Sequence, residues 1–219
     1  VIDGYSVHDA RLRAGEFLAK QHPVDADVVI GVPDSGLDAA LGYANASGIP
    51  YGIGFIKNKY IGRTFISPGQ ANREDKVKIK LNTISSTVCG KRVVMVDDSI
   101  VRGTTCGPII KLLREAGATE VHMCVSAPPF TDPCYYGVDI DSRDNLIANH
   151  HTIEEIRQII GADSLSYLSM EDVVHLTADD DGDRFCTACF SGQYPTEVPS
   201  DTRKNRFEGK ISESVKERG

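Results

Sequence analysis

The hydrophobic positions of this chain follow two patterns, one typical of helices and one typical of buried strands. From Val7 to Leu18 apolar residues recur at helical spacing, which predicts an amphipathic helix over residues 6–20. The continuous run from Val28 to Val32 is rich in β-branched residues and predicts a strand that is buried on both faces. The two patterns then alternate along most of the chain.

The later elements continue this alternation. Beyond residue 32 we expect helices over residues 37–46, 105–115, 153–160 and 170–176, and strands over residues 51–56, 92–96, 120–126 and 165–168. Gly117 lies where the second of these helices should end. Strands that alternate with helices predict an α/β fold with a doubly wound parallel sheet.

The chain divides into two expected parts. A main domain covers residues 1–178, and a C-terminal helical and irregular extension covers residues 179–219. The extension contains an acidic turn, a Cys-x-x-Cys pair and a charged tail after Pro199, which we expect to be mobile. The chain opens on Val1 rather than on Met, so we expect a processed form or a piece of a longer protein.

Composition and charge narrow the classes of function. Of the 219 residues, 31 are Asp or Glu and 24 are Lys or Arg, which gives a formal net charge of −7. Nonspecific nucleic-acid binding usually needs a basic face, so we expect no nucleic-acid partner. No apolar run approaches the ~20 residues that span a bilayer, and no secretory leader opens the chain. We therefore expect a cytoplasmic protein without a membrane partner.

The segment Val93–Thr105 carries the strongest chemical signal. Four apolar residues end in the adjacent acids Asp97 and Asp98, so both carboxylates are expected at the carboxyl end of a parallel strand, where open α/β sheets bind ligands. A Gly-Thr-Thr triplet then opens a helix, whose free backbone N–H groups and positive dipole end favour a phosphate. Alone, the acids would suggest a surface turn and the threonines an ordinary helix cap. Their order predicts a site for a phosphate and a diol.

This order of strand, paired acids, Gly-Thr-Thr and helix resembles that of the type I phosphoribosyltransferases, which bind 5-phosphoribosyl-1-pyrophosphate (PRPP). The resemblance implies their fold. It also implies that Asp97 and Asp98 hold the ribose 2′- and 3′-hydroxyls, while the loop that follows holds the 5′-phosphate. That loop comprises Ser99, Ile100, Val101, Arg102, Gly103, Thr104 and Thr105.

A second loop fits the same site. Gly31–Gly36 links a strand to a helix, so its backbone amides either face an anion or form a plain turn capped by Asp34 or Ser35. By resemblance it is the pyrophosphate loop, with Asp34 and Ser35 at the ligand. The resemblance also places Ser35, Asp97 and Asp98 near a Mg²⁺ that is held chiefly by PRPP oxygens, in keeping with the preference of Mg²⁺ for phosphates and waters.

Residues 57–80 form a long polar connection that ends in a basic run. Such a connection is usually either disordered or a functional lid. The resemblance implies a flexible loop that closes over PRPP, in which Lys57, Tyr60 and Arg63 act as a catalytic lid and neutralise the departing diphosphate. A solvated basic loop would explain the charges but not the Gly-Arg-Thr string at residues 62–64.

A closer resemblance is to the amidophosphoribosyltransferase family, the glutamine PRPP amidotransferases. It extends over nearly all of residues 1–200 and is carried by Asp97–Thr105, Gly31–Ser35, Lys57–Thr64, Pro133–Gly137 and Glu154–Asp163. It implies transfer of ammonia, taken from glutamine in the intact enzyme, to PRPP. The products would be 5-phosphoribosylamine and pyrophosphate, in the first step of de novo purine biosynthesis. It further implies inhibition by purine nucleotides and a homotetramer.

One domain of that family has no match in this chain. The family's glutaminase domain begins with a nucleophilic Cys, whereas position 1 here is Val. We therefore expect the N-terminal glutaminase domain to be absent from this chain, which would use free ammonia at best. The expected reaction requires little covalent chemistry from the protein, so we assign no residue as a general base. Positioning, charge neutralisation and exclusion of water should dominate.

Three of the six cysteines form a separate signal. Cys186 and Cys189 make a Cys-x-x-Cys pair that, with Cys134, is compatible with a zinc site, a redox pair, a cluster site or unligated thiols. By resemblance they match three of the four cysteines that hold a [4Fe–4S] cluster in some family members. The fourth has no counterpart in the chain, so we expect the cluster to be absent or incomplete.

Two other functions stay open at this point. A salvage phosphoribosyltransferase, which joins a purine or pyrimidine base to PRPP, would share the phosphate loop but needs a base-binding hood that the region of the three cysteines does not suggest. A noncatalytic sensor of PRPP or nucleotides would usually add a DNA-binding domain, and the sequence suggests neither such a domain nor a basic surface.

Overall fold

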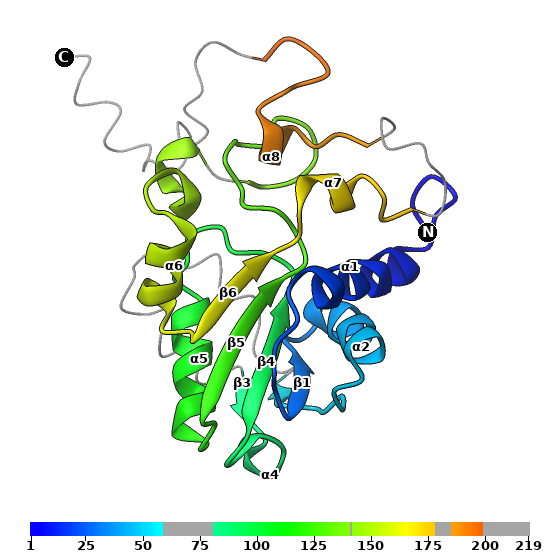
Figure 1. The fold of residues 1–219 in the computed structure, drawn as a ribbon. Helices are drawn as coiled ribbons and strands as arrows, with labels where there is room; N and C mark the ends of the chain where they lie inside the picture. Colours follow the sequence, from blue (N-terminus) through cyan, green and yellow to red (C-terminus); the bar gives the residue numbers. More distant parts are fainter. Residues whose placement is uncertain (59–80, 141, 178–184, 199–219) are drawn as a thin grey trace, which may run out of the picture.

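The computed structural model describes residues 1–58, 81–140, 142–177 and 185–198, which fold around a four-stranded sheet (Figure 1). The strand order is β1-β4-β5-β6, and each neighbouring pair is parallel. The strands are β1 (Val28–Gly31), β4 (Arg92–Asp97), β5 (Glu120–Val125) and β6 (Ser164–Tyr167). The predicted parallel α/β sheet is confirmed.

Helices cover both faces of this sheet. α1 (Val7–Gln21) and α2 (Gly36–Ser47) pack on one face, and α5 (Cys106–Glu115) and α6 (Ile153–Ile160) pack on the other. The chain therefore has the predicted doubly wound arrangement. Each of these helices lies within two residues of its expected bounds, and Gly117 follows α5 at a φ of +96°.

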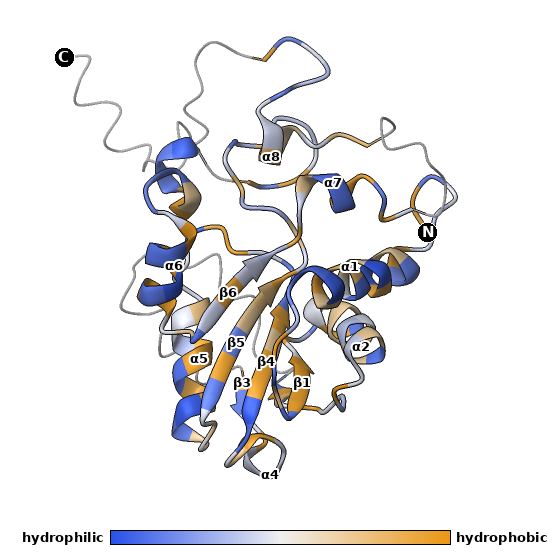
Figure 2. Cartoon of the chain, viewed as in Figure 1, coloured by the Kyte–Doolittle hydropathy of each residue, from blue (hydrophilic) through white to orange (hydrophobic). Residues whose placement is uncertain are grey.

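The strands are hydrophobic on both faces because each face has its own core. In β4, Val93 and Met95 belong to the cluster beneath α5 and α6, while Val94 and Val96 belong to the cluster beneath α1 and α2. All four side chains are fully buried. Figure 2 shows the hydrophobic colours gathered in β1 and β4. This double burial explains the continuous apolar run in the sequence.

The strand predicted over residues 51–56 is wrong in its bounds. Tyr51 makes only an isolated bridge to Val29 at the edge of β1, and the regular strand is β2 (Phe55–Lys57). Glycines at positions 52 and 54 account for the interruption, because glycine weakens a strand and supplies no side chain to pack. β2 pairs antiparallel with β3 (Leu81–Thr83), which precedes α4 (Ser85–Val88); neither β3 nor α4 was predicted.

The C-terminal third is less regular than expected. The helix predicted over residues 170–176 is shorter, because α7 covers only Met170–Val173. Ser169 caps its first turn by accepting a hydrogen bond from the Asp172 N–H at 3.0 Å. The two adjacent β-branched residues at 173 and 174 disfavour its continuation.

Three short helical elements in this region had no periodic signal in the sequence. They are η2 (Arg143–Asn145), η3 (Ile147–Asn149) and α8 (Ala188–Ser191). None of the helices in the described part of the chain is both long and apolar enough to cross a membrane.

Candidate functional site

The connections that leave β1 and β4 run in opposite directions from the same end of the sheet. After β1 the chain passes through α2 to Tyr51, on the side of β1 away from β4. After β4 it passes through α5 to β5, on the other side. The loops 32–35 and 98–105 therefore meet where the strand order reverses, which is where open α/β sheets bind ligands. The structure thus brings together the two loops that the sequence singled out.

The first of these loops rests directly on the end of β4. The Val32 N–H donates a hydrogen bond to the Val96 carbonyl at 2.9 Å. A Cβ on Gly36 would lie 2.4 Å from the same carbonyl oxygen, so only glycine permits this contact. Ser35 stands at the N-cap of α2 but its side chain makes no capping bond. The Pro33–Asp34 peptide bond in this loop is cis.

The paired acids lie at the carboxyl end of β4, as predicted. Asp97 Oδ1 accepts the Asp98 N–H at 2.8 Å, and the Ser99 hydroxyl donates to Asp98 Oδ1 at 3.0 Å. Burial, and then the adjacent Asp98 carboxylate, raise the pKa of the Asp97 carboxyl well above its usual range. No Lys or Arg in the described part of the chain forms an ion pair with either acid. Two carboxylates without a cation are suited to accepting hydroxyl hydrogens or to approaching a metal ion.

The second loop is held from below by η3. Ile100 is buried, and the Val101 carbonyl accepts the Ile147 N–H at 2.9 Å. Gly103 has a φ of +71°, and a Cβ there would lie 2.5 Å from the Ile147 Cδ1 atom. Ile147 thus supports this loop, and it could not be predicted from the sequence because the contact joins residues far apart in the chain.

The same loop presents unused hydrogen-bond donors. Among the described residues, the backbone N–H groups of Gly103, Thr104 and Thr105 donate to no other group. Thr105 is the N-cap of α5 and its side chain makes no capping bond. Pro108 in the first turn has no N–H to satisfy. N–H groups at the start of a helix that find no internal partner are suited to binding a phosphate.

Lys57 approaches the site from the hairpin. It is the last residue of β2, and its ammonium pairs with the Asp34 carboxylate of the first loop. The structure therefore brings this predicted lid residue to the predicted pyrophosphate loop. Tyr60 and Arg63 lie outside the described residues.

The three cysteines of interest lie away from these loops. Cys134 and Cys189 pack against the small cluster of Phe130, Ile140 and Leu146, and Cys186 is exposed. Burial, and then the neighbouring Cys134, raise the pKa of the Cys189 thiol to about 11. Within the described residues no group of three or more His, Cys, Asp or Glu side chains is arranged to hold a metal ion. A [4Fe–4S] cluster is held by four thiolates, of which Cys134, Cys186 and Cys189 could supply three.

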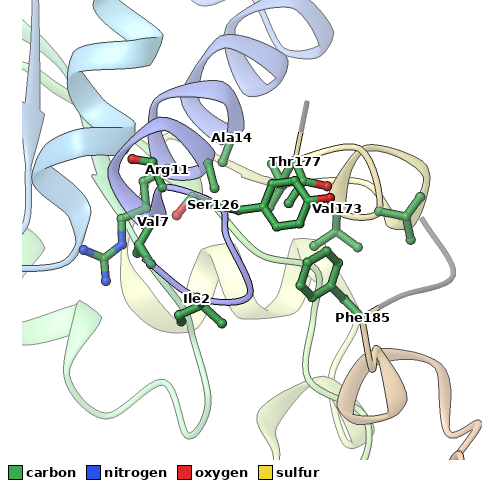
Figure 3. Close-up of a pocket in the computed structure, with 13 residues that line it drawn as sticks. Ile2, Val7, Arg11, Ala14, Ser126, Val173, Thr177 and Phe185 are labelled. Atoms are coloured by element: carbon green, nitrogen blue, oxygen red, sulfur yellow. The ribbon is translucent and has the colours of Figure 1, made fainter. Parts of the chain in front are cut away.

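A cavity of about 320 Å³ lies beside Ser126, between α1 and the segment that contains Val173 and Thr177 (Figure 3). Its wall is mostly apolar and comes from the N-terminal turns, α7 and Phe185, whose ring meets that of Tyr5 edge to face with centroids 5.8 Å apart. Ser126 also lines it and donates to the Asp97 carbonyl through its N–H at 2.9 Å and its hydroxyl at 3.1 Å. None of the predicted ligand residues lines this cavity, and the sequence did not indicate it.

Comparison with known proteins identifies the family to which the chain belongs. The model of the phosphoribosyl transferase domain matches residues 3–158, and the chain belongs to that family. Within this family the chain is similar to one kind of enzyme. Curated relatives that are identical to it at about half of the aligned positions are amidophosphoribosyltransferases. That of Bacillus subtilis is 56% identical over 204 residues, which are 92% of this chain and 43% of the relative. That of a Synechocystis strain is 53% identical over 207 residues, which are 94% of this chain and 42% of the relative.

Solved structures agree with the curated relatives. The glutamine PRPP amidotransferase of Bacillus subtilis, complexed with ADP and GMP, superposes with a TM-score of 0.82 at 56% identity over 92% of this chain and 45% of that chain. The predicted fold and the predicted resemblance to amidophosphoribosyltransferases are both confirmed. The chain spans less than half the length of the curated relatives that it matches.

Proposed function

We propose that this chain binds PRPP and transfers ammonia to it, giving 5-phosphoribosylamine and pyrophosphate. The observation that carries the proposal is the sequence of elements at the end of β4. Within the described residues, two acids that pair with no Lys or Arg lead into a loop whose last three N–H groups are unused, at the start of α5. The similarity to amidophosphoribosyltransferases over 92% of the chain supports the choice of reaction.

The two ends of PRPP would meet the two loops. The 5′-phosphate would accept hydrogen bonds from the N–H groups of Gly103, Thr104 and Thr105, with the rest of the loop from Ser99 shaping the pocket. Asp97 and Asp98 would accept the ribose 2′- and 3′-hydroxyls. The diphosphate would then extend towards Ser35, which lies at the start of α2.

The residues at this site fit a Mg²⁺ that is shared with the ligand. The described part of the chain offers no set of three metal-ligating side chains, and Mg²⁺ commonly takes one or two carboxylates together with phosphate oxygens and waters. Asp97, Asp98 and Ser35 would hold such an ion from the protein side. When bound, it would neutralise charge on the diphosphate.

The reaction itself is a substitution at the ribose C1 atom. The ammonia nitrogen forms a bond to C1 as the bond from C1 to the diphosphate oxygen breaks, and the diphosphate leaves with the electron pair. The nitrogen then releases a proton to solvent. The protein contributes orientation of the ribose and compensation of the charge that develops on the leaving group. We propose that Lys57, which pairs with Asp34 in the loop after β1, contributes to this compensation and that Tyr60 and Arg63 assist it.

Several wider properties belong to the same proposal. In the intact enzyme ammonia would come from glutamine, and purine nucleotides would bind in competition with PRPP; the ADP and GMP of the Bacillus subtilis complex support that expectation. We also propose the family's homotetramer, a cytoplasmic location, and a boundary near residue 178 between the main domain and the C-terminal extension.

The test is an assay of pyrophosphate release by this chain with PRPP, Mg²⁺ and ammonium at mildly alkaline pH, with nucleobases supplied in parallel. We expect release that depends on ammonium. Release that requires a nucleobase would identify a salvage phosphoribosyltransferase instead. Binding of PRPP without turnover under any condition would identify a noncatalytic sensor.

A further inference from the structure

Lys57 and Asp34 form an ion pair across the mouth of the candidate site. The ammonium belongs to the end of β2 and the carboxylate to the loop between β1 and α2, so the pair joins two elements that share no regular secondary structure. The Lys57 side chain is 25% exposed, whereas that of Asp34 is 70% exposed. The lysine is therefore held in place by its surroundings, while the carboxylate faces solvent on the side from which a ligand would arrive.

The chemistry of Asp34 does not suit a direct contact with the expected ligand. A carboxylate has no hydrogen to donate and repels a diphosphate, so its place in a pyrophosphate loop needs another explanation. It lies one residue before the N-cap of α2, where a helix favours negative charge. It also pairs with the Lys57 ammonium, a cation that could otherwise bind the diphosphate. The Asp34 carboxylate thus occupies the position that a negatively charged diphosphate would take beside Lys57.

We propose that Asp34 competes with the diphosphate for Lys57. In the empty site the carboxylate holds the ammonium in position, and a bound diphosphate displaces it. The lysine is then already oriented when PRPP arrives, and the same carboxylate recovers it when pyrophosphate leaves. Asp34 is on this account a positioning residue that weakens diphosphate binding and favours product release. The inference rests on the proposed function, since it assumes that a diphosphate occupies this loop.

The proposal is tested by titrating Mg²⁺ and inorganic pyrophosphate into the chain by calorimetry, in a cycle of Asp34→Asn, Lys57→Gln and the double variant. Exposed ion pairs are worth up to about fivefold in an equilibrium constant. We therefore expect Asp34→Asn to tighten pyrophosphate binding by about two- to fivefold. Lys57→Gln should weaken it. In the Lys57→Gln background the Asp34→Asn change should tighten binding clearly less, because it then removes only the repulsion between the carboxylate and the diphosphate and releases no ammonium.

A matched control separates this competition from a general effect of charge. Asp38→Asn removes the same charge from the first turn of α2, where the carboxylate faces His8 and Arg11 instead of Lys57. It should leave pyrophosphate affinity within about twofold of the unsubstituted chain in either background. Unfolding midpoints of all variants would establish that each is folded.

Two results would overturn the inference while leaving the proposed function intact. Equal tightening by Asp34→Asn in both backgrounds would mean that only the net charge matters. Weaker binding by Asp34→Asn would mean that the carboxylate supports the ligand. If the unsubstituted chain bound neither PRPP nor pyrophosphate in the presence of Mg²⁺, the proposed function would be contradicted, and this inference with it.

Discussion

Acidic side chains lie at both ends of the central strand β4, but within the described residues they pair with an arginine only at the amino end. At the amino end, Asp27 accepts hydrogen bonds from the Arg92 backbone N–H at 2.8 Å and from its Nη2 atom at 2.8 Å, and Asp25 lies 2.5 Å from Nη1. These bonds lower the pKa of Asp27 to about 2. At the carboxyl end of β4, Asp97 and Asp98 stand side by side, and no Lys or Arg in the described residues pairs with them.

This contrast separates residues that serve folding from residues that serve a ligand. The amino end ties the first residues of β1 and β4 together with charge-assisted hydrogen bonds. The carboxyl end keeps two like charges adjacent and leaves donors unused, an arrangement that costs free energy in the empty protein. This cost is offset when a ligand provides hydrogen-bond partners for the carboxylates and for the unused N–H groups. Substitutions at the two ends should therefore change the stability of the fold in different ways.

The contact between the start of α2 and the end of β4 should be the most sensitive to a small change. Gly36→Ala would place a Cβ 2.4 Å from the Val96 carbonyl oxygen, and we expect it to lower the free energy of unfolding by about 1–3 kcal/mol. Gly107→Ala is the control, because its Cβ would have 3.9 Å to the nearest atoms of Ile160. Urea unfolding of both variants measures the difference. Equal stability of the two variants would show that the start of α2 is not in close contact with the end of β4.

The acidic pair should make the empty chain less stable as the pH rises. The folded-state pKa of Asp97 is raised, so the stability that its protonated form contributes is present at about pH 4 and is lost as the pH rises through the folded-state value. Asp97→Asn should therefore match the unsubstituted chain near pH 4 and exceed its unfolding midpoint by on the order of 2 °C or more at pH 7. A variant that is less stable at pH 7 would contradict the assigned burial.

Asp27 should show the opposite dependence on pH. Its pKa is lowered to about 2, so its contribution is present above the unfolded value near 4 and disappears as the pH falls towards 2. Asp27→Asn should be less stable than the unsubstituted chain at pH 7, and the gap should close between about pH 4 and pH 2. Thermal unfolding in a series of buffers measures it. A gap that persists at pH 2 would mean that the bond to Arg92 is not ionic.

The smallest effect is expected at the hydroxyl of Tyr167. This side chain is 7% exposed, at the carboxyl end of β6, and its Oη atom finds no hydrogen-bond partner among the residues that the structure describes. Because a buried hydroxyl without a partner does not stabilise the fold, Tyr167→Phe should leave the unfolding free energy unchanged or raise it by up to about 1 kcal/mol. A clear loss of stability would reveal a partner for this hydroxyl.

The sequence allowed prediction of the features that are local in the chain. The order of strand, acids, loop and helix in Val93–Thr105 lies within one stretch, and continuous burial of a strand leaves a direct signal in its residues. Both predictions are confirmed for the fold, and the residues meet at one edge of the sheet. The assignment of individual residues to PRPP and Mg²⁺ stays a prediction.

The features that the sequence did not reveal depend on contacts between distant segments. Ile147 supports the loop of residues 98–105 from 46 positions beyond Val101, and β2 pairs with β3 across a long intervening segment. The cavity beside Ser126 is formed by segments from both ends of the chain. Short elements such as α8 hold too few residues to show a helical period.

We propose that Asp97 and Asp98, which form no ion pair with a Lys or Arg of the described residues, are placed to bind PRPP. The most direct test is the unfolding midpoint of the unsubstituted chain and of the Asp97→Asn, Asp98→Asn double variant at pH 7, each with and without PRPP and Mg²⁺. We expect the order of the two unfolding midpoints to reverse on addition of PRPP. The variant is the more stable protein without ligand, and only the unsubstituted chain gains stability when PRPP is present. A variant that PRPP stabilises as strongly as the unsubstituted chain would contradict the claim.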